Sequence, residues 1–310
     1  MAIDKNYRCE VTKPHDFDTF WDEVVERLMA SDLNPICDKD EFRSDSDVEV
    51  FQAYYDSIDS LKVSAWYTKP SGTRQKLPAI ILMPGYQNDP PIPKDWARKG
   101  YACISVNPRG KVRSRLQFDP GYPGYPGLLT YGILDRNVYS YKGFYADTWR
   151  AVDFLLSRSE VDPDRIGVAG SSQGGGLTIT TSAIRKEIRA ASAGAPYLCG
   201  FKDAIKLIDS YPYQEINDYI NYFAGVDGKV FETLSYFDGI CFADKIDCPI
   251  IMNVGLQDNV CPPETGYALF NQIKSENKKL YEYDGHGHDA GRIHHSAVID
   301  EFFEQNLKLI

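Results

Sequence analysis

Two kinds of hydrophobic pattern alternate along the chain. Almost uninterrupted apolar runs occur at residues 77–83, 101–106, 166–169, 190–195 and 249–255. Runs of this length, bounded by turn residues, are typical of strands that are buried on both faces of a sheet. Apolar residues at helical spacing occur between or after these runs, at residues 145–157 and 298–309. The alternation predicts an α/β fold with a mostly parallel central sheet and helices on both faces.

The N-terminal part of the chain has a different pattern. In residues 15–28, apolar side chains recur at helical spacing between acidic ones, at Phe17, Phe20, Trp21, Val24 and Leu28. This spacing predicts an amphipathic helix, within an N-terminal helical extension that spans residues 1–45. Residues 48–51 and 63–67 alternate between apolar and polar, which predicts antiparallel strands.

Domain organisation follows from what separates these elements. The chain contains no internal repeat and no low-complexity linker, so we expect a single domain over residues 1–310. Residues 116–131 combine Gly, Tyr and Pro without a clear period, as expected of a long loop that lines a site or an interface. Residues 200–240 predict a helical, tyrosine-rich insertion, and residues 279–283 predict the last strand.

The candidate chemistry centres on residues 170–174, whose sequence Gly-Ser-Ser-Gln-Gly fits the pattern G-x-S-x-G. This pentapeptide directly follows the apolar run 166–169 and precedes residues that start a helix. A strand, a sharp turn that holds a serine, and a helix together form the nucleophile elbow of the α/β-hydrolase fold. Ser172 is therefore the candidate nucleophile, and its alternative interpretation is a Gly/Ser-rich loop.

A serine hydroxyl needs a base, and that base needs an orienting carboxylate. In the α/β-hydrolase fold the acid and the histidine follow the serine in that order along the chain. Asp258 lies just after the apolar run 249–255, so it is the candidate acid. The loop after the last predicted strand contains two candidate bases, His286 and His288.

The choice between the two histidines depends on the direction of counting. Spacing from the preceding strand favours His286, whereas spacing from the closing helix favours His288. A docked helix fixes register better than a loop does, so we favour His288 and keep His286 as the alternative. We expect His294 and His295, in the closing segment, to be surface residues.

The oxyanion of an acyl-transfer intermediate needs two backbone N–H donors. The residue after the nucleophile supplies one, which makes Gln173 a candidate. The other comes from a loop early in the sheet, and Tyr86 follows the apolar run 77–83 there. The ring of Tyr86 could also form a wall of a small acyl pocket.

Composition limits the classes of partner. The chain has 310 residues, of which 43% are hydrophobic, and a net charge of 34 − 44 = −10. An acidic surface argues against binding to nucleic acids or to anionic membranes. The N-terminus lacks the apolar core of a signal peptide, and no apolar run reaches the roughly 18 residues of a membrane span. The seven cysteines lack C-x-x-C pairs, so we expect reduced thiols, a cytoplasmic location, no metal and no cofactor.

Several motifs resemble those of the acetyl xylan esterase / cephalosporin C deacetylase family of α/β-hydrolases. They include residues 17–21, 85–86, 107–110, 132–135, 170–175, 233–239 and 255–263. Departures from the family pattern are Pro84 before Gly-Tyr, Lys111 after Arg-Gly, and Asp289 after the second histidine. The resemblance implies a serine esterase that deacetylates small substrates, such as xylo-oligosaccharides or cephalosporin C-like esters. It also implies a homohexamer whose active sites face an internal cavity.

Two further hypotheses remain open. One is another α/β-hydrolase, of the dienelactone-hydrolase or peptidase type. The other is a non-catalytic binding protein that kept the fold and lost the chemistry. A p-nitrophenyl ester series, measured with and without a serine-directed fluorophosphonate, separates all three.

Overall fold

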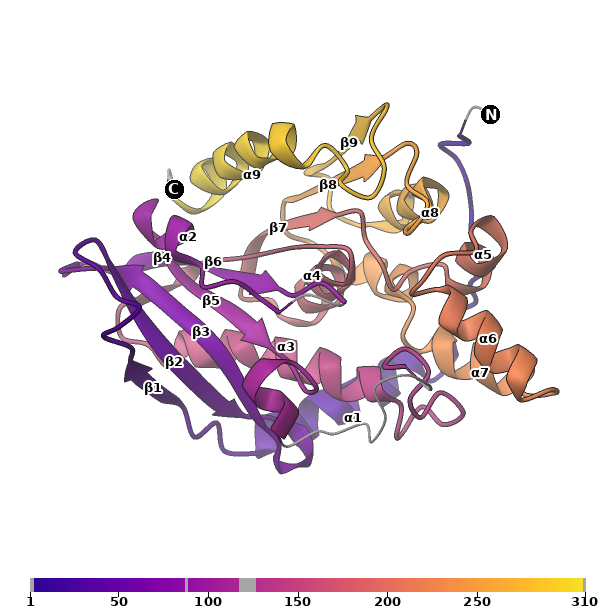
Figure 1. Cartoon of the computed structure of the whole chain (residues 1–310), viewed down its shortest axis with the longest axis horizontal. Coiled ribbons are helices and arrows are strands. Elements are labelled where there is room, and N and C mark those ends of the chain that lie inside the picture. The colour runs from indigo at the N-terminus through magenta and orange to yellow at the C-terminus, as the bar shows by residue number, and fades with distance from the viewer. Residues whose placement is uncertain (1–2, 87–88, 117–126, 309–310) are drawn as a thin grey trace.

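A computed structural model of the chain describes residues 3–86, 89–116 and 127–308. In this part, a nine-stranded sheet runs in the order β1-β2-β3-β5-β4-β6-β7-β8-β9 (Figure 1). The strands are β1 (Ile36–Lys39), β2 (Val48–Asp56), β3 (Lys62–Pro70), β4 (Leu77–Met83), β5 (Ala102–Asn107), β6 (Val161–Ser171), β7 (Ile188–Gly194), β8 (Ile250–Gly255) and β9 (Lys278–Tyr283). Strands β4 to β9 pair in parallel, while β1, β2 and β3 pair antiparallel. The predicted mostly parallel sheet is confirmed.

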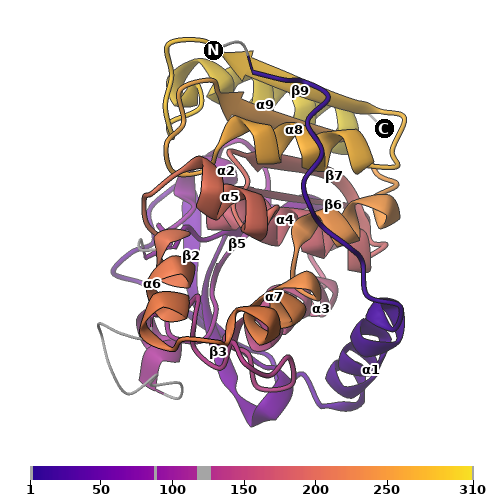
Figure 2. The same cartoon turned by 90° about the vertical axis from the view of Figure 1, so that its right-hand side faces the viewer.

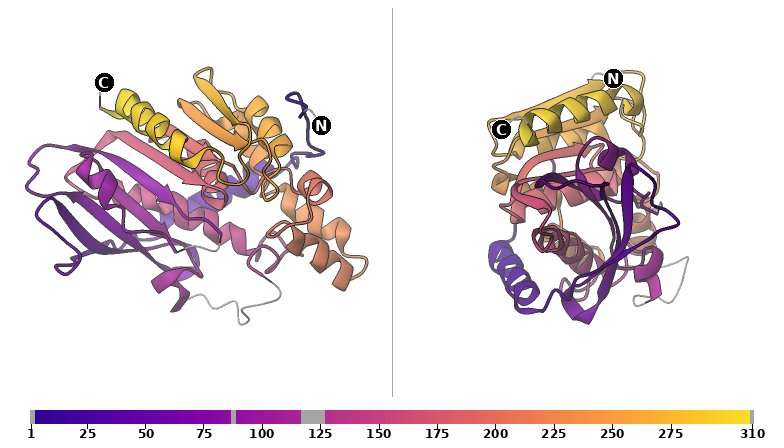
Figure 3. Two further views of the ribbon diagram at one scale, coloured as in Figure 1. Left: turned by 45° about the horizontal axis from the view of Figure 1, so that its top comes forward. Right: turned by 90° about the vertical axis from the view of Figure 1, so that its left-hand side faces the viewer.

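Helices cover both faces of this sheet. On one face lie α2 (Lys94–Arg98) and α9 (Arg292–Leu307), whose side chains Trp96 and Phe303 meet edge to face at 5.7 Å between ring centroids. On the other face lie α3 (Ser140–Leu156) and α4 (Gln173–Ile184), and α8 (Pro263–Gln272) packs against β8. Helix α1 (Phe17–Ala30) lies outside α3 (Figure 3). The predicted two-sided helical cover is therefore confirmed.

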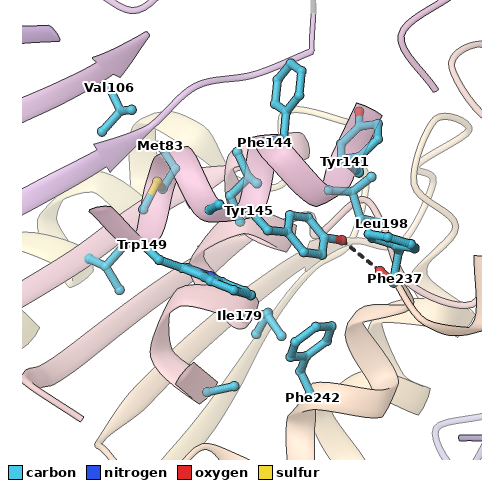
Figure 4. Packing of buried hydrophobic residues seen from close by; sticks show 14 of the residues in the cluster. Met83, Val106, Tyr141, Phe144, Tyr145, Trp149, Ile179, Leu198, Phe237 and Phe242 are labelled. Atoms are coloured by element: carbon cyan, nitrogen blue, oxygen red, sulfur yellow. Dashed lines mark hydrogen bonds between the residues drawn. The ribbon is translucent and has the colours of Figure 1, made fainter. Parts of the chain in front are cut away.

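An aromatic core joins α1 to the helix beneath it. Trp21 is fully buried and packs against Tyr145 and Trp149 of α3, at 5.6 and 5.1 Å between ring centroids. Its indole N–H donates to the Tyr236 carbonyl at 2.8 Å, and the Tyr145 hydroxyl donates to the Phe237 carbonyl at 2.7 Å (Figure 4). Burying each large apolar side chain contributes about 1.5–3 kcal/mol, so the apolar stripe of the predicted N-terminal helix docks this element firmly.

Between β7 and β8 lie the helices α5 (Phe201–Leu207), α6 (Gln214–Tyr222) and α7 (Asp227–Ser235). They lie beyond the carboxyl ends of the parallel strands (Figure 1). The N-terminal segment passes beside α8 and α5 on its way to α1 (Figure 2). There the Tyr7 hydroxyl donates to Asp203 of α5 at 3.0 Å. The assignment of the whole chain to one domain stays a prediction.

Some element boundaries differ from those expected. Strand β1 was not predicted, because its four residues include two charged ones and give no clear alternation. Helix α3 begins at residue 140 rather than 145, since its first turns are buried all round and show no amphipathic period. Helix α9 begins at residue 292 rather than 298. Of the predicted loop at 116–131, residues 117–126 lie outside the described residues.

Candidate active site

Ser172 is the single residue between the end of β6 and the start of α4. Its backbone has φ 59° and ψ −123°, a conformation that L residues rarely adopt. The Ser172 N–H donates to the Gly194 carbonyl at 2.9 Å, and its own carbonyl accepts from Tyr197 N–H at 3.0 Å. These bonds to the last residue of β7 and to the loop after it hold the strained turn. The predicted strand, sharp turn and helix are confirmed.

Two glycines make room for this turn. A Cβ on Gly174 would lie 2.5 Å from the Met83 carbonyl oxygen at the end of β4. A Cβ on Gly170 would lie 2.5 Å from the Gly174 carbonyl oxygen. Because both obstacles are backbone atoms, no side-chain movement relieves them. The G-x-S-x-G spacing is therefore a packing requirement between β6, α4 and β4.

Asp258 follows β8 and is 5% exposed. Its Oδ1 accepts hydrogen bonds from the N–H groups of Val260 and Cys261, at 2.8 and 2.9 Å. Its Oδ2 lies 2.9 Å from Nδ1 of His288, in the loop after β9. With Nδ1 held by a buried carboxylate, Nε2 of this ring is the nitrogen left to exchange protons with a substrate or nucleophile.

The other histidine of this loop has a different partner. Nδ1 of His286 lies 2.7 Å from Oδ2 of Asp289, which is an exposed residue. Of the two candidate bases, His288 is thus the one that the structure joins to Asp258. His294 is exposed, as expected.

The expectation of a surface position for His295 is wrong. Its side chain is 1% exposed, because α9 begins earlier than predicted and turns this residue inward. Its Nδ1 lies 2.9 Å from the Tyr283 hydroxyl. Burial disfavours the charged imidazolium and lowers the pKa of His295 to about 4.

The surroundings of the Ser172 hydroxyl include a thiol. Burial raises the pKa of Cys261 well above its usual value, and a hydrogen bond with the Ser172 side chain opposes that rise. Within the described residues, no hydrogen bond joins Ser172 to His288. Such bonds are often long in unliganded enzymes and shorten only when substrate is bound. The structure thus brings Asp258 and His288 into contact. The Ser172 side chain contacts Cys261, three residues after Asp258.

Gln173 connects the elbow to the loop after β4. Its N–H begins α4, and its side chain is fully buried. Its side-chain NH₂ donates to the carbonyls of Pro84 and Gly85, at 3.3 and 3.2 Å, and its Oε1 accepts from the Tyr141 hydroxyl at 2.8 Å. The Gln173 side chain therefore binds the loop that carries Tyr86, the other candidate oxyanion donor.

Tyr86, the second candidate donor, is half-buried and held at two points. The Nζ of Lys111 donates to its backbone carbonyl, and its phenol donates to Glu215 of α6. Lys111 is 6% exposed, and burial lowers its pKa to about 8. In the sequence, Lys111 stands out only as a departure from the family pattern. Nothing in the sequence connects Glu215 of α6 to the loop after β4, so this contact could not be predicted.

The described residues contain no group of three or more His, Cys, Asp or Glu side chains placed to hold a metal ion. All seven cysteines are free thiols. None of the helices described is long and apolar enough to cross a membrane.

Sheet order, helical cover and elbow together define the α/β-hydrolase fold. Within that class, a model of the acetyl xylan esterase (AXE1) family matches residues 2–306, so the chain belongs to this family. The resemblance to acetyl xylan esterases is confirmed.

Solved structures and curated relatives agree with this assignment. An acetyl xylan esterase from Paenibacillus sp. R4 is 32% identical with a TM-score of 0.89, and 98% of each chain is covered. Acetyl xylan esterase 1 from Thermoanaerobacterium sp. JW/SL YS485 is 28% identical with a TM-score of 0.90, over 97% of this chain and 96% of that one. The acetyl esterase Axe7A of Xylanibacter ruminicola is 28% identical over 86% of this chain. The match spans 62% of that relative's length.

Proposed function

We propose that the protein is a serine carboxylesterase that removes acetyl groups from small O-acetylated substrates. The observation that carries this proposal is the strained conformation of Ser172 in its elbow, together with the buried Asp258 carboxylate that holds His288. Ser172, Asp258 and His288 follow the carboxyl ends of the parallel strands β6, β8 and β9, which supports the proposal. Family membership supports the same reaction class.

The reaction proceeds in two halves. Nε2 of His288 takes the proton of the Ser172 hydroxyl while Oγ attacks the acetyl carbonyl carbon, and the carbonyl oxygen becomes an oxyanion. The N–H groups of Gln173 and Tyr86 stabilise that oxyanion. As the intermediate collapses, the alcohol leaves with the proton from His288, and the acetyl group stays bound to Oγ of Ser172 as an ester. Water repeats the sequence, which releases acetic acid and restores the serine.

Asp258 has a defined part in this cycle. Its carboxylate fixes the ring orientation and the tautomer of His288, and it stabilises the imidazolium that forms when Ser172 loses its proton. Two backbone N–H bonds keep the carboxylate itself in place. This arrangement keeps the His288 ring in one orientation, with Nε2 directed away from Asp258.

Two of the solved structures are named acetyl xylan esterases, and the curated relative is named an acetyl esterase. We therefore propose acetylated xylo-oligosaccharides as substrates, and the resemblance adds cephalosporin C-like esters. We propose a small acyl pocket with the Tyr86 ring as one wall, so acetate esters should react faster than octanoate esters. We also propose a closed homohexamer that admits oligosaccharides and excludes polymeric xylan. Light scattering that finds only monomer at micromolar concentration would contradict this assembly.

The decisive experiment compares the wild type with Ser172→Ala. We expect hydrolysis of p-nitrophenyl acetate to fall by about 10⁴-fold or more, because triad members act as a unit. A fluorophosphonate probe should label the wild type and not the variant, and circular dichroism should show the same fold for both. Near wild-type turnover by folded Ser172→Ala protein would refute the mechanism.

A further inference from the structure

Glu215 is a carboxylate in an unusual position. It lies on α6, is 9% exposed, and accepts a hydrogen bond from the Tyr86 hydroxyl through Oε1. Its Oε2 is buried and has no hydrogen-bond partner among the described residues. Burying an ionisable group with an oxygen unpaired costs stability, and the pKa of Glu215 is raised to about 6 by this burial. A packing role alone would be served better by an apolar side chain.

The phenol of Tyr86 is fully engaged by its surroundings. Its oxygen donates to Glu215 and accepts from the Leu129 N–H at 3.3 Å. A Cβ on Gly127 would lie 2.2 Å from Oε2 of Glu215, so the backbone at 127–129 closes directly over this pair. The Tyr86 ring also meets Tyr197 edge to face at 6.1 Å between centroids. The ring direction of Tyr86 is therefore set by α6 and by residues 127–129.

The backbone of the same loop is held by two further side chains. Lys111 binds the Tyr86 carbonyl, and the Gln173 side chain binds the Gly85 carbonyl of the preceding peptide. The Tyr86 N–H belongs to that preceding peptide. Once the two carbonyls and the ring are fixed, the direction of this N–H has little freedom left.

We propose that Glu215 is a positioning residue that holds Tyr86 so that its N–H faces the oxyanion. Helix α6 would thereby act on the reaction centre indirectly, through Tyr86. This inference rests on the proposed function, in which Tyr86 is an oxyanion donor. A carboxylate suits this task because hydrogen bonds to a charged acceptor are stronger than those to a neutral one.

Three variants test the inference: Glu215→Leu, Glu215→Gln and Tyr86→Phe. Removing one oxyanion donor costs about 10²–10³ in kcat, so misdirecting one should cost about 10–100-fold. We expect Glu215→Leu and Tyr86→Phe to lose kcat to this extent for p-nitrophenyl acetate, with KM changed by less than about threefold. Glu215→Gln keeps an acceptor oxygen and should retain most of the activity. The double variant Glu215→Leu/Tyr86→Phe should be no worse than either single one.

Asp218→Asn is the matched control, because Asp218 lies on the same helix and bonds to Gln214 and Tyr211 rather than to Tyr86. It should leave kcat and fluorophosphonate labelling rate unchanged, while Glu215→Leu should slow both. The inference is overturned by wild-type kcat in Glu215→Leu, by equal losses in Asp218→Asn, or by additive losses in the double variant. If Glu215→Leu does not fold, wild-type kcat in Tyr86→Phe overturns it equally. Failure of the proposed function is distinct, since it would appear as hydrolysis that survives Ser172→Ala.

Discussion

The two candidate oxyanion donors are held in opposite ways. The Gln173 N–H sits in a turn whose shape is fixed by backbone contacts, through glycines at 170 and 174 and hydrogen bonds from Ser172 to Gly194 and Tyr197. The Tyr86 N–H sits in a loop held by side chains from distant segments, namely Lys111, Gln173 and Glu215. One donor is thus set by backbone packing, and the other by polar contacts that can be altered one at a time.

A change in the backbone packing around the elbow turn should abolish activity. Gly174→Ala places a methyl group 2.5 Å from the Met83 carbonyl, so α4 and β4 must separate. We expect ester hydrolysis below detection, together with a lowered Tm or loss of soluble protein. Gly228→Ala is the control, since a Cβ there meets nothing within 4 Å, and it should be neutral or slightly stabilising. An active, stable Gly174→Ala protein would mean that the elbow is not held by packing.

The two histidines give the next largest effect. His288→Ala should lower kcat by about 10⁴-fold, since its ring is the one joined to buried Asp258. His286→Ala should keep a measurable fraction of activity, because its partner Asp289 is exposed. Both variants should keep the wild-type Tm within a few degrees. The reverse pattern of activity would show that His286 is the base.

Loss of one polar contact to the Tyr86 loop should lower kcat by a smaller factor. Lys111→Met is an example. Losing the bond to the Tyr86 carbonyl should lower kcat by about 10-fold, whereas Lys111→Gln, the residue of the family pattern, should lose less. Lys111→Met should at the same time raise the stability of the folded protein. Burial lowers the pKa of Lys111 from 10.5 to about 8, so carrying its charge in the folded state costs up to about 3 kcal/mol below pH 8.

The sign of this pH dependence follows from proton counting. Between pH 8 and 10.5 the unfolded chain holds the Lys111 proton and the folded chain does not, so wild-type stability should rise with pH in that window. Lys111→Met lacks this contribution, and its advantage in Tm at pH 7 should shrink as the pH approaches 10.5. Thermal unfolding of both proteins from pH 7 to 10.5 tests this. A Tm difference that stays constant with pH would show that the charge on Lys111 does not destabilise the folded protein.

The same division explains what the sequence could predict. Ser172 and Asp258 follow buried strands within a few residues, so local pattern and chain order locate them. The choice of His288 over His286 required counting back from the closing helix, and the structure joins His288 to Asp258. Glu215 could not be found, because its partner lies 129 residues away in sequence. Burial of His295 was missed because the polar first turn of α9 shows no apolar period.

The two outer strands of the sheet have a consequence for handling the protein. An open strand edge offers free N–H and C=O groups to any other extended chain. At one edge, β1 exposes Asp38 and Lys39, and at the other, β9 exposes Lys279 and Glu282. A second chain that paired with either edge would have to strip water from these charges. Concentrated solutions should therefore resist growth of the sheet into fibrils.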